Sequence, residues 1–184
     1  GVVLVEGKSD VTFLRHTATA LKSAGYVEFN LEDVGIVPIL IGGCGSVKHW
    51  VTLNLANDLG LPWCVFLDSD IGGDPSQVKS IQKRKEEVEG QGRPFYATRK
   101  REIENYLCPE LIFTEAGVKV EFTDTCDAKK IIGTSVSMKP DDVIDRFWPS
   151  MTGDRIVERS KYVENGTERV ELKDLVTQLL TLVR

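Results

Sequence analysis

The chain has 184 residues, of which 41% are hydrophobic, and its formal net charge is -5 at pH 7. This length and composition suit one α/β domain with an added region better than two full domains, and they exclude collagen-like and disordered proteins. No apolar run approaches the roughly 20 residues that a membrane-spanning helix needs. The negative charge argues against binding of nucleic acid by bulk charge alone, although divalent cations at an acidic site would reverse the local sign.

The four cysteines, Cys44, Cys64, Cys108 and Cys126, are scattered and form no CxxC pair. The sequence therefore predicts neither a zinc site nor a disulfide framework, and we expect reduced thiols in a cytoplasmic protein. The chain starts with Gly1-Val2-Val3-Leu4, inside a predicted strand and without a methionine. We therefore expect it to be a piece of a longer protein.

Apolar runs alternate with helical patterns along the first part of the chain. Strands are predicted over residues 2–5, 36–41, 63–67 and 94–97, with Pro38 placing the second near a sheet edge. The first helix is predicted between Ser9, which would cap its start, and Gly25. Further helices are expected over residues 47–59 and 76–89, and a helical segment over 102–107.

Strands that alternate with helices predict a right-handed parallel α/β sheet over residues 1–107. From Cys108 onward the pattern weakens. Residues 114–125 suit a strand pair or an irregular segment, residues 141–148 a helix, and residues 172–184 an amphipathic helix with Leu175, Leu179 and Leu182 on one face. We therefore expect a core over 1–107 and an appended, mainly helical region over 108–184.

The strand over residues 63–67 ends in two carboxylates, Asp68 and Asp70. Its apolar run shows no alternation, which is typical of a strand buried on both faces of a parallel sheet. If the backbone stays extended, residues two apart point to the same side. Ligands of such sheets bind beyond the carboxyl ends of the strands, so residues at several strand ends are expected to share one site: Glu6, Gly42, Gly43, Asp68 and Asp70.

Two like charges held close together need a cation, or one of them must take a proton. A solvated pair of aspartates is the alternative for Asp68 and Asp70 alone. The loop Glu6-Gly7-Lys8-Ser9-Asp10 makes the prediction of a metal site more specific, because it brings two further acids to the same end of the predicted sheet. Mg²⁺ or Mn²⁺ would suit this site, since hard cations prefer carboxylate oxygens and the site has no Cys or His cluster.

The pair Glu6-Gly7 after the first strand and Asp68-Ser69-Asp70 after a later one resemble the signature of the TOPRIM domain. Asp10 and the stretch Arg101-Glu102-Ile103-Glu104-Asn105-Tyr106-Leu107 resemble its overcoming-lysogenization-defect (OLD) form. The resemblance covers residues 1–107 and implies a Rossmann-like TOPRIM core. It further implies a DNA endonuclease that hydrolyses phosphodiester bonds with two ions of Mg²⁺ or Mn²⁺.

The resemblance also implies roles for individual residues. The metal ligands would be Glu6, Asp10, Asp68, Asp70 and Glu104, and of these Glu6, Asp68 and Asp70 would be catalytic. Glu102 is the alternative to Glu104; otherwise it is an exposed acid in a first helical turn, favoured by the helix dipole. The family uses a late basic residue near the scissile phosphate, for which Lys173 is the first candidate and Lys161 the second, although most lysines are simply solvated.

Basic residues concentrate between positions 79 and 101. A solvated helix face is one interpretation, but their place beside the acidic site makes four of them candidates for contacts with a DNA backbone: Lys83, Arg84, Arg99 and Lys100. Lys8 would contact phosphate or form a salt bridge. Backbone NH groups over residues 42–46 could face a phosphate, but the Gly-Lys-Ser/Thr ending of a nucleotide-binding loop is missing.

The partners implied by the resemblance are DNA and an N-terminal ABC-type ATPase in the same chain, through which the protein would dimerise; no membrane is expected. Two alternatives stay open. A magnesium-dependent phosphotransferase of the haloacid dehalogenase kind also places Asp-x-Asp after a strand, but it leaves Glu6 unexplained. A non-catalytic TOPRIM module would bind metal without turnover.

Overall fold

The computed structural model of the chain describes residues 1–42, 50, 55–58 and 60–183. Its centre is a parallel sheet of four strands in the order β2-β1-β3-β4. The strands are β1 (Val2–Val5), β2 (Val37–Leu40), β3 (Trp63–Leu67) and β4 (Phe95–Ala97). The expected parallel α/β fold is confirmed, and each strand lies within a residue or so of its expected position.

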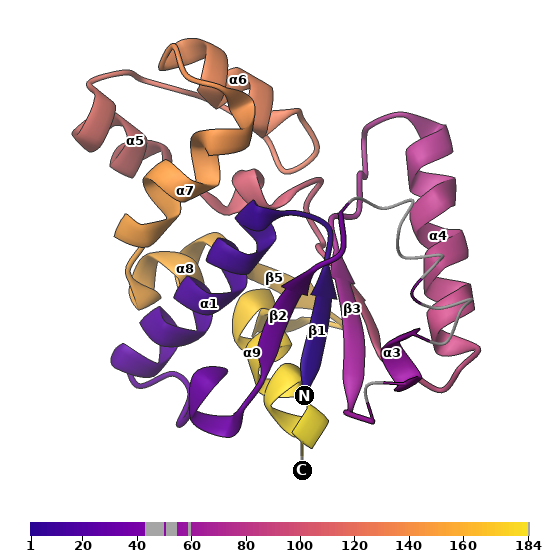
Figure 1. Cartoon of the computed structure of the whole chain (residues 1–184). Coiled ribbons are helices and arrows are strands. Elements are labelled where there is room, and N and C mark those ends of the chain that lie inside the picture. The colour runs from indigo at the N-terminus through magenta and orange to yellow at the C-terminus, as the bar shows by residue number, and fades with distance from the viewer. Residues whose placement is uncertain (43–49, 51–54, 59, 184) are drawn as a thin grey trace.

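Helices cover both faces of the sheet, with α1 (Lys8–Ser23) and α9 (Glu171–Leu180) on one side and α4 (Pro75–Glu89) and α3 (Leu55–Asp58) on the other (Figure 1). Alternation along β1 divides the core accordingly. Val3 and Val5 join the cluster beneath α1, whereas Val2 and Leu4 join a second cluster. Every residue of β1 and β3 is buried, as a strand covered on both faces requires.

Pro38 lies in β2 at the edge of the sheet, as its sequence position predicted. The amides of Val37 and Ile41 donate to carbonyls of Gly1 and Val5, at 3.0 and 2.9 Å. Because hydrogen bonding alternates along a parallel strand, Pro38 faces the free edge, where its missing N–H removes no ladder hydrogen bond.

The second half of the chain contributes helices, short 3₁₀ turns and one hairpin. The helices are α5 (Pro109–Ala116), α6 (Ala128–Ser135), α7 (Val143–Phe147) and α8 (Gly153–Arg159). The antiparallel hairpin is β5 (Lys161–Glu164) with β6 (Thr167–Val170). Over the described residues the 3₁₀ turns are η1 (Glu32–Val34), η2 (Ile103–Tyr106), η3 (Pro140–Asp142), η4 (Trp148–Ser150) and η5 (Thr181–Val183).

This half packs directly into the core of the first half. One buried cluster contains Phe13 of α1, Tyr106, Trp148 and Leu172, and the ring centroids of Phe13 and Trp148 lie 4.5 Å apart. The fold is therefore a sheet layer with a helical group packed over α1 (Figure 1). The boundary between regions 1–107 and 108–184 stays a prediction.

Several local expectations differ from the structure. Ser9 is not the cap of α1: the N-cap lies two residues earlier, at Gly7, and the Asp10 carboxylate accepts the Gly7 amide at 2.8 Å. Residues 114–125 are not a strand pair; they continue α5 and then run irregularly. The terminal helix is shorter than expected, because α9 ends at Leu180 and η5 follows it. The expected helix over 47–59 and the glycine-rich segment lie mostly outside the described residues.

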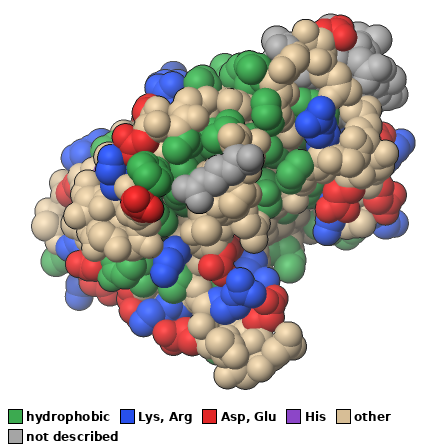
Figure 2. Space-filling view, turned by 90° about the horizontal axis from the view of Figure 1, so that it is seen from below, with side chains coloured by type: hydrophobic (Ala, Val, Ile, Leu, Met, Phe, Trp, Pro, Cys, Tyr) green, Lys and Arg blue, Asp and Glu red, His purple; other side chains and the backbone are tan. Residues whose placement is uncertain are grey.

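The end of the sheet that carries the amino ends of the strands is seen from below in Figure 2. Hydrophobic side chains gather over the middle of this face and charged side chains lie mainly around it. In the described part of the chain, no helix combines the length and apolar character that crossing a bilayer requires.

Gly72 and Gly92 form a matched pair for a stability test. Both have positive φ, of 79° and 69°, but a Cβ on Gly72 would lie 2.6 Å from the Thr125 carbonyl oxygen, whereas one on Gly92 would meet nothing within 4 Å. Gly92→Ala should lower the free energy of unfolding by roughly 1–2 kcal/mol through left-handed strain alone. Gly72→Ala should lower the free energy of unfolding by about 1–3 kcal/mol more, because the backbone at Thr125 must move to make room for the methyl group. Equal losses in urea denaturation would contradict this packing.

Candidate metal centre

An acidic cavity of about 460 Å³ lies at the carboxyl ends of β1 and β3. Nine carboxylates and two lysines line it. The acids are Glu6, Asp10, Asp68, Asp70, Glu102, Glu104, Asp141, Asp142 and Asp145, and the lysines are Lys8 and Lys129. The five ligands expected from the sequence therefore meet at one cavity, although they come from three separate segments of the chain.

Asp10 lies in the first turn of α1 and is only 7% exposed. One carboxylate oxygen, Oδ2, accepts the Gly7 amide at 2.8 Å, which fixes the side chain at the start of the helix. Burial raises the pKa of Asp10 to about 6, and the nearby charge of Glu6 adds to the increase, although the amide hydrogen bond opposes both. Asp10 thus stabilises the start of α1 and also faces the cavity.

Asp68 follows β3 directly and lines the cavity. Its Oδ1 atom is buried and receives no hydrogen bond from the described residues. Burial raises the pKa of Asp68 well above its usual range, and the charges of Asp10 and Glu104 raise it further. A buried oxygen without a donor is expensive unless a proton or a cation satisfies it.

Asp70 departs from the extended backbone that the sequence suggested. Its φ is 54°, in the left-handed region, yet its side chain lines the same cavity as Asp68. Burial and the charge of Glu6 raise the pKa of Asp70, whereas Arg101 lowers it. The turn, rather than strand alternation, brings the two aspartates together.

Glu104 and Glu102 belong to the 3₁₀ turn η2 and its N-cap, and both line the cavity. Glu104 is 2% exposed, and burial followed by the charge of Glu102 raises its pKa to about 8. Glu102 is 9% exposed and its Oε1 accepts the amide of Lys129 at 2.8 Å. Glu102 is therefore not the exposed first-turn acid that the sequence offered as an alternative.

The loop after β3 is tied to the segment that follows β4. The Ser69 amide donates to Thr98 Oγ1 at 2.9 Å, and the Ser69 hydroxyl donates to the Lys100 carbonyl at 2.6 Å. The Asp70 amide donates to the Arg101 carbonyl at 3.0 Å. These bonds hold the two aspartates against the same segment that continues into Glu102 and Glu104.

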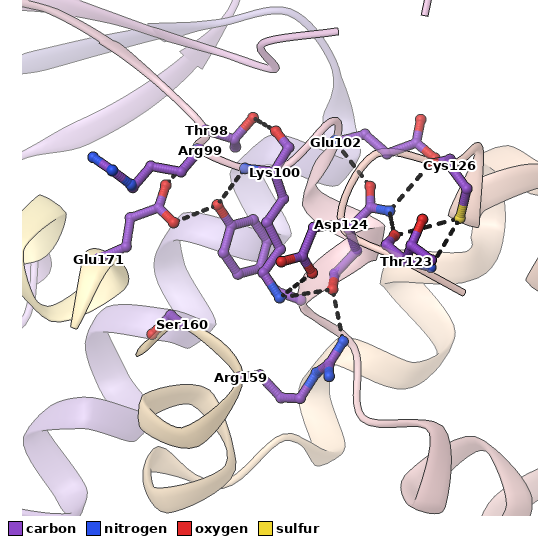
Figure 3. A network of polar contacts seen from close by, with 12 residues as sticks. Thr98, Arg99, Lys100, Glu102, Thr123, Asp124, Cys126, Arg159, Ser160 and Glu171 are labelled. Atoms are coloured by element: carbon purple, nitrogen blue, oxygen red, sulfur yellow. Dashed lines mark hydrogen bonds and ion pairs between the residues drawn. The ribbon is translucent and has the colours of Figure 1, made fainter. Parts of the chain in front are cut away.

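A second set of contacts holds η2 from behind the cavity (Figure 3). The Lys100 ammonium contacts the Asn105 carbonyl at 3.3 Å and the Asp124 carboxylate at 2.9 Å. Arg159 of α8 donates to the same carbonyl at 3.0 Å, and the Asn105 side chain accepts the Glu102 amide at 3.0 Å. The glutamate-bearing turn is thus fixed from three sides.

The network continues to the start of α9, where Glu171 binds two partners. Its carboxylate accepts the Tyr106 hydroxyl at 2.7 Å and the Arg99 amide at 2.6 Å. The same hydroxyl accepts the Lys100 amide at 3.3 Å. The last helix therefore supports the segment between β4 and η2, which sequence reasoning did not anticipate.

The four candidate DNA contacts have different surroundings. Lys100 is 8% exposed and its ammonium is engaged inside the protein, so the predicted place on a DNA-binding face is wrong for this residue. Arg84 is largely covered and pairs with Glu87 at 2.6 Å. Arg99 is exposed, with its guanidinium 3.9 Å from the ring centroid of Tyr162, and Lys83 is exposed on α4. None of the four lines the acidic cavity.

The two lysines that were candidates for the basic residue near the scissile phosphate do not line the cavity. Lys173 lies on α9 and Lys161 on β5, and neither lines the cavity. The lysines that line the cavity are Lys8 and Lys129 of α6. Lys8 forms a salt bridge with Asp145 at 2.6 Å, which is one of the two roles expected for it. Lys129 and the acids at positions 141, 142 and 145 were missed because no local motif marks them, and only the folding of the helical region brings them here.

The donor set suits a hard divalent cation. The cavity offers carboxylate oxygens, one of them the buried and unpartnered Oδ1 of Asp68. Among the described residues, however, no group of three or more His, Cys, Asp or Glu side chains already stands close enough to hold a metal ion. Like charges repel one another when no cation lies between them. The acids are therefore of the right chemical type for a divalent ion, but their side chains would have to move closer together to bind it.

Glu104→Gln tests the electrostatic state of the cavity. The folded-state pKa of about 8 lies above the usual 4.5, so the folded protein keeps a proton that the unfolded chain loses. In metal-free buffer the free energy of unfolding should therefore fall as the pH rises from about 4.5 to 8. Glu104→Gln should flatten this slope and stabilise the protein at about pH 9 by on the order of 3 kcal/mol.

The exposed Glu28 provides the control. Glu28→Gln should keep the wild-type pH dependence in urea denaturation at each pH. If Glu104→Gln leaves the slope unchanged, the folded protein does not hold that proton.

Two comparisons with known proteins gave matches. Residues 1–70 match the family model described as "Overcoming lysogenization defect protein-like, TOPRIM domain". The C-terminal region of the OLD protein of Xanthomonas campestris pv. campestris is similar at a TM-score of 0.58 and 13% identity, over 100% of this chain and 95% of that one. The C-terminal region of the Burkholderia pseudomallei OLD protein gives 0.58 and 14%, over 100% and 98%.

Among curated proteins no significant match was found. At such low identities the likeness to solved structures establishes the fold alone, whereas the family model identifies the segment that carries Glu6, Asp10, Asp68 and Asp70. Residues 1–70 are therefore similar to the OLD-like TOPRIM family, and the chain as a whole has a fold similar to that of the C-terminal region of OLD proteins.

Proposed function

We propose that this chain is the catalytic part of a metal-dependent endonuclease that hydrolyses phosphodiester bonds of DNA. The observation that carries the proposal is the buried acid cluster around the unpartnered Asp68 Oδ1, at the carboxyl ends of a TOPRIM-like sheet. The OLD-like TOPRIM match supports a metal-binding domain of the nuclease type. It favours this function over a haloacid dehalogenase-like phosphotransferase.

Five residues would hold two Mg²⁺ or Mn²⁺ ions: Glu6, Asp10, Asp68, Asp70 and Glu104. When bound, such ions activate water and stabilise the leaving oxygen of a phosphodiester. The protein contributes a set of acids that keep their protons to a higher pH than exposed carboxylates do. Burial raises the pKa of Asp10 to about 6 and that of Glu104 to about 8. Glu104 would release its carboxyl proton as a cation binds.

The substrate and partners follow from the same proposal. DNA would approach the open side of the cavity, and its backbone would contact the exposed Lys83 and Arg99. An N-terminal ABC-type ATPase in the same chain would supply dimerisation, and the setting would be cytoplasmic. A catalytic role for Lys173 would require the substrate to reach beyond the cavity, because this residue does not line it.

Asp68→Asn separates metal binding from folding. The amide keeps the shape of the carboxylate but removes the buried charge, so the metal-free variant should be at least as stable as the wild type. Mg²⁺ or Mn²⁺ should raise the melting temperature of the wild type and not that of the variant. In parallel, the wild type should cut supercoiled plasmid with Mg²⁺ or Mn²⁺ but not with EDTA, and Asp68→Asn should not cut.

The exposed Asp58 of α3 offers a matched control, and Asp58→Asn should retain both the melting shift and cleavage. Cleavage by a clean preparation of Asp68→Asn would refute the assignment. Metal binding by the wild type without cleavage, even when the full-length protein is tested, would favour the non-catalytic TOPRIM module.

A further inference from the structure

A second pocket, separate from the acidic cavity, lies along the free edge of β4. Its volume is about 300 Å³, and residues of β4, α4, β5 and α9 line it. Aromatic rings make up part of its wall, because Phe66, Phe95 and Tyr96 are among the lining residues. This volume is at the small end of the range for ligand pockets, so the pocket suits a single planar group.

One side of this pocket carries an arginine stacked on a tyrosine. The guanidinium of Arg99 lies 3.9 Å from the ring centroid of Tyr162, and the Arg99 side chain is 48% exposed. Figure 3 shows this side chain pointing away from the polar network around Lys100. Because only one face of the guanidinium rests on the ring, the other face is a flat surface on which a second planar group can stack.

The acids of the pocket are engaged within the protein, whereas two neutral polar groups are not. Glu171 and Asp174 both accept hydrogen bonds from neighbouring side chains. Within the described part of the chain, no hydrogen bond reaches the Tyr96 hydroxyl or the side-chain amide of Gln178. Each of these two groups can both donate and accept, so they suit a neutral ligand whose edge carries donors and acceptors.

A nucleobase combines these properties. It has flat aromatic faces that stack on tyrosine rings and guanidinium planes, and it has donors and acceptors along its edge. A base inside a duplex is already stacked and paired, so only an unpaired or extruded base could enter such a pocket.

The pocket and the acidic cavity are joined by a short stretch of chain. Arg99 lines the pocket and Glu102 lines the cavity, and a separation of three residues spans at most about 11 Å. A DNA strand with a phosphodiester at the acid cluster can therefore place a neighbouring base against Arg99. The edge of the guanidinium, which carries its N–H donors, can still face the DNA backbone while its flat face stacks on the base.

We propose that this pocket binds an unpaired base of the DNA strand that enters the acidic cavity. Arg99 and Tyr162 are the stacking surface, and Tyr96 and Gln178 are the hydrogen-bonding partners of the base. This inference rests on the proposed nuclease function, and it names the substrate as DNA with an unpaired region next to the bond that is cut.

The test compares two single-stranded oligonucleotides of equal length, one with bases and one built from abasic sites. Fluorescence anisotropy, with Ca²⁺ in place of Mg²⁺, gives the affinity of the chain for each strand, and the ratio of the two affinities is the readout. Both strands carry the same phosphates, so charge alone affects them equally. The wild type should prefer the strand with bases by at least about 5-fold, which is the lower end of what stacking of one base contributes.

Variants of the stacking surface separate stacking from charge. Tyr162→Leu should lose most of the preference, whereas Tyr162→Phe should retain it, because only the hydroxyl that donates to Asp174 is lost. Arg99→Lys keeps the charge but not the flat face, so it should weaken binding of the strand with bases and leave binding of the abasic strand unchanged. Gln178→Leu, a change at an exposed position, should reduce the preference a few-fold.

Tyr26 provides the matched control. Its hydroxyl also donates to an aspartate, Asp154, and Tyr26 lines neither this pocket nor the acidic cavity. Tyr26→Leu should keep the wild-type ratio. A ratio that stays unchanged in both Tyr162→Leu and Gln178→Leu, or that falls equally in Tyr26→Leu, would overturn the inference.

The same measurements distinguish this inference from the proposed function. A wild type that cuts plasmid with Mn²⁺ and yet binds both strands equally would overturn the inference and leave the nuclease function standing. A wild type that binds neither Mn²⁺ nor DNA would refute the nuclease function, and the inference with it.

Discussion

Mutual repulsion among buried carboxylates is the constraint on which this structure depends. Asp10, Asp68 and Glu104 come from three segments, and burial raises the pKa of each. The charge of Asp10 raises the pKa of both Asp68 and Glu104 further. A fold that only had to be stable would place apolar or amide side chains there. This arrangement of acids therefore suits a cation-binding site, in which the free energy of cation binding offsets the cost of burying the acids in the metal-free protein.

The polar network behind the cavity explains how the chain maintains this arrangement. Lys100 and Arg159 hold the Asn105 carbonyl, and Glu171 holds Tyr106, so the turn with Glu104 is fixed by residues from α8 and α9 (Figure 3). The region after residue 107 is thus more than an appended layer: it shares the core with α1 and supports the acids. Lys129 of α6, one of the two lysines that line the cavity, comes from this region too.

The sequence predicted the four strands and the acids Glu6, Asp68 and Asp70 because both are local signals: apolar runs, and charges where those runs end. Glu104 was expected only through the resemblance to the OLD form. It could not predict that Lys100 is buried, since its charge resembles that of its exposed neighbours until Asp124 and Asn105 fold around it. The hairpin β5-β6 was missed because its strands are short and exposed, without an apolar run. Lys129 became visible only through tertiary packing, for which no spacing rule exists.

The most direct test of the central claim is the number of protons released when Mn²⁺ binds, measured by calorimetry in buffers of different ionisation enthalpy. Glu104 has a pKa of about 8 in the metal-free fold, so at about pH 7 it is mostly protonated and must ionise as the cation binds. The account predicts net proton release at that pH, which decreases as the pH is raised above about 8. Binding without proton release at neutral pH, or no binding at all, would contradict it.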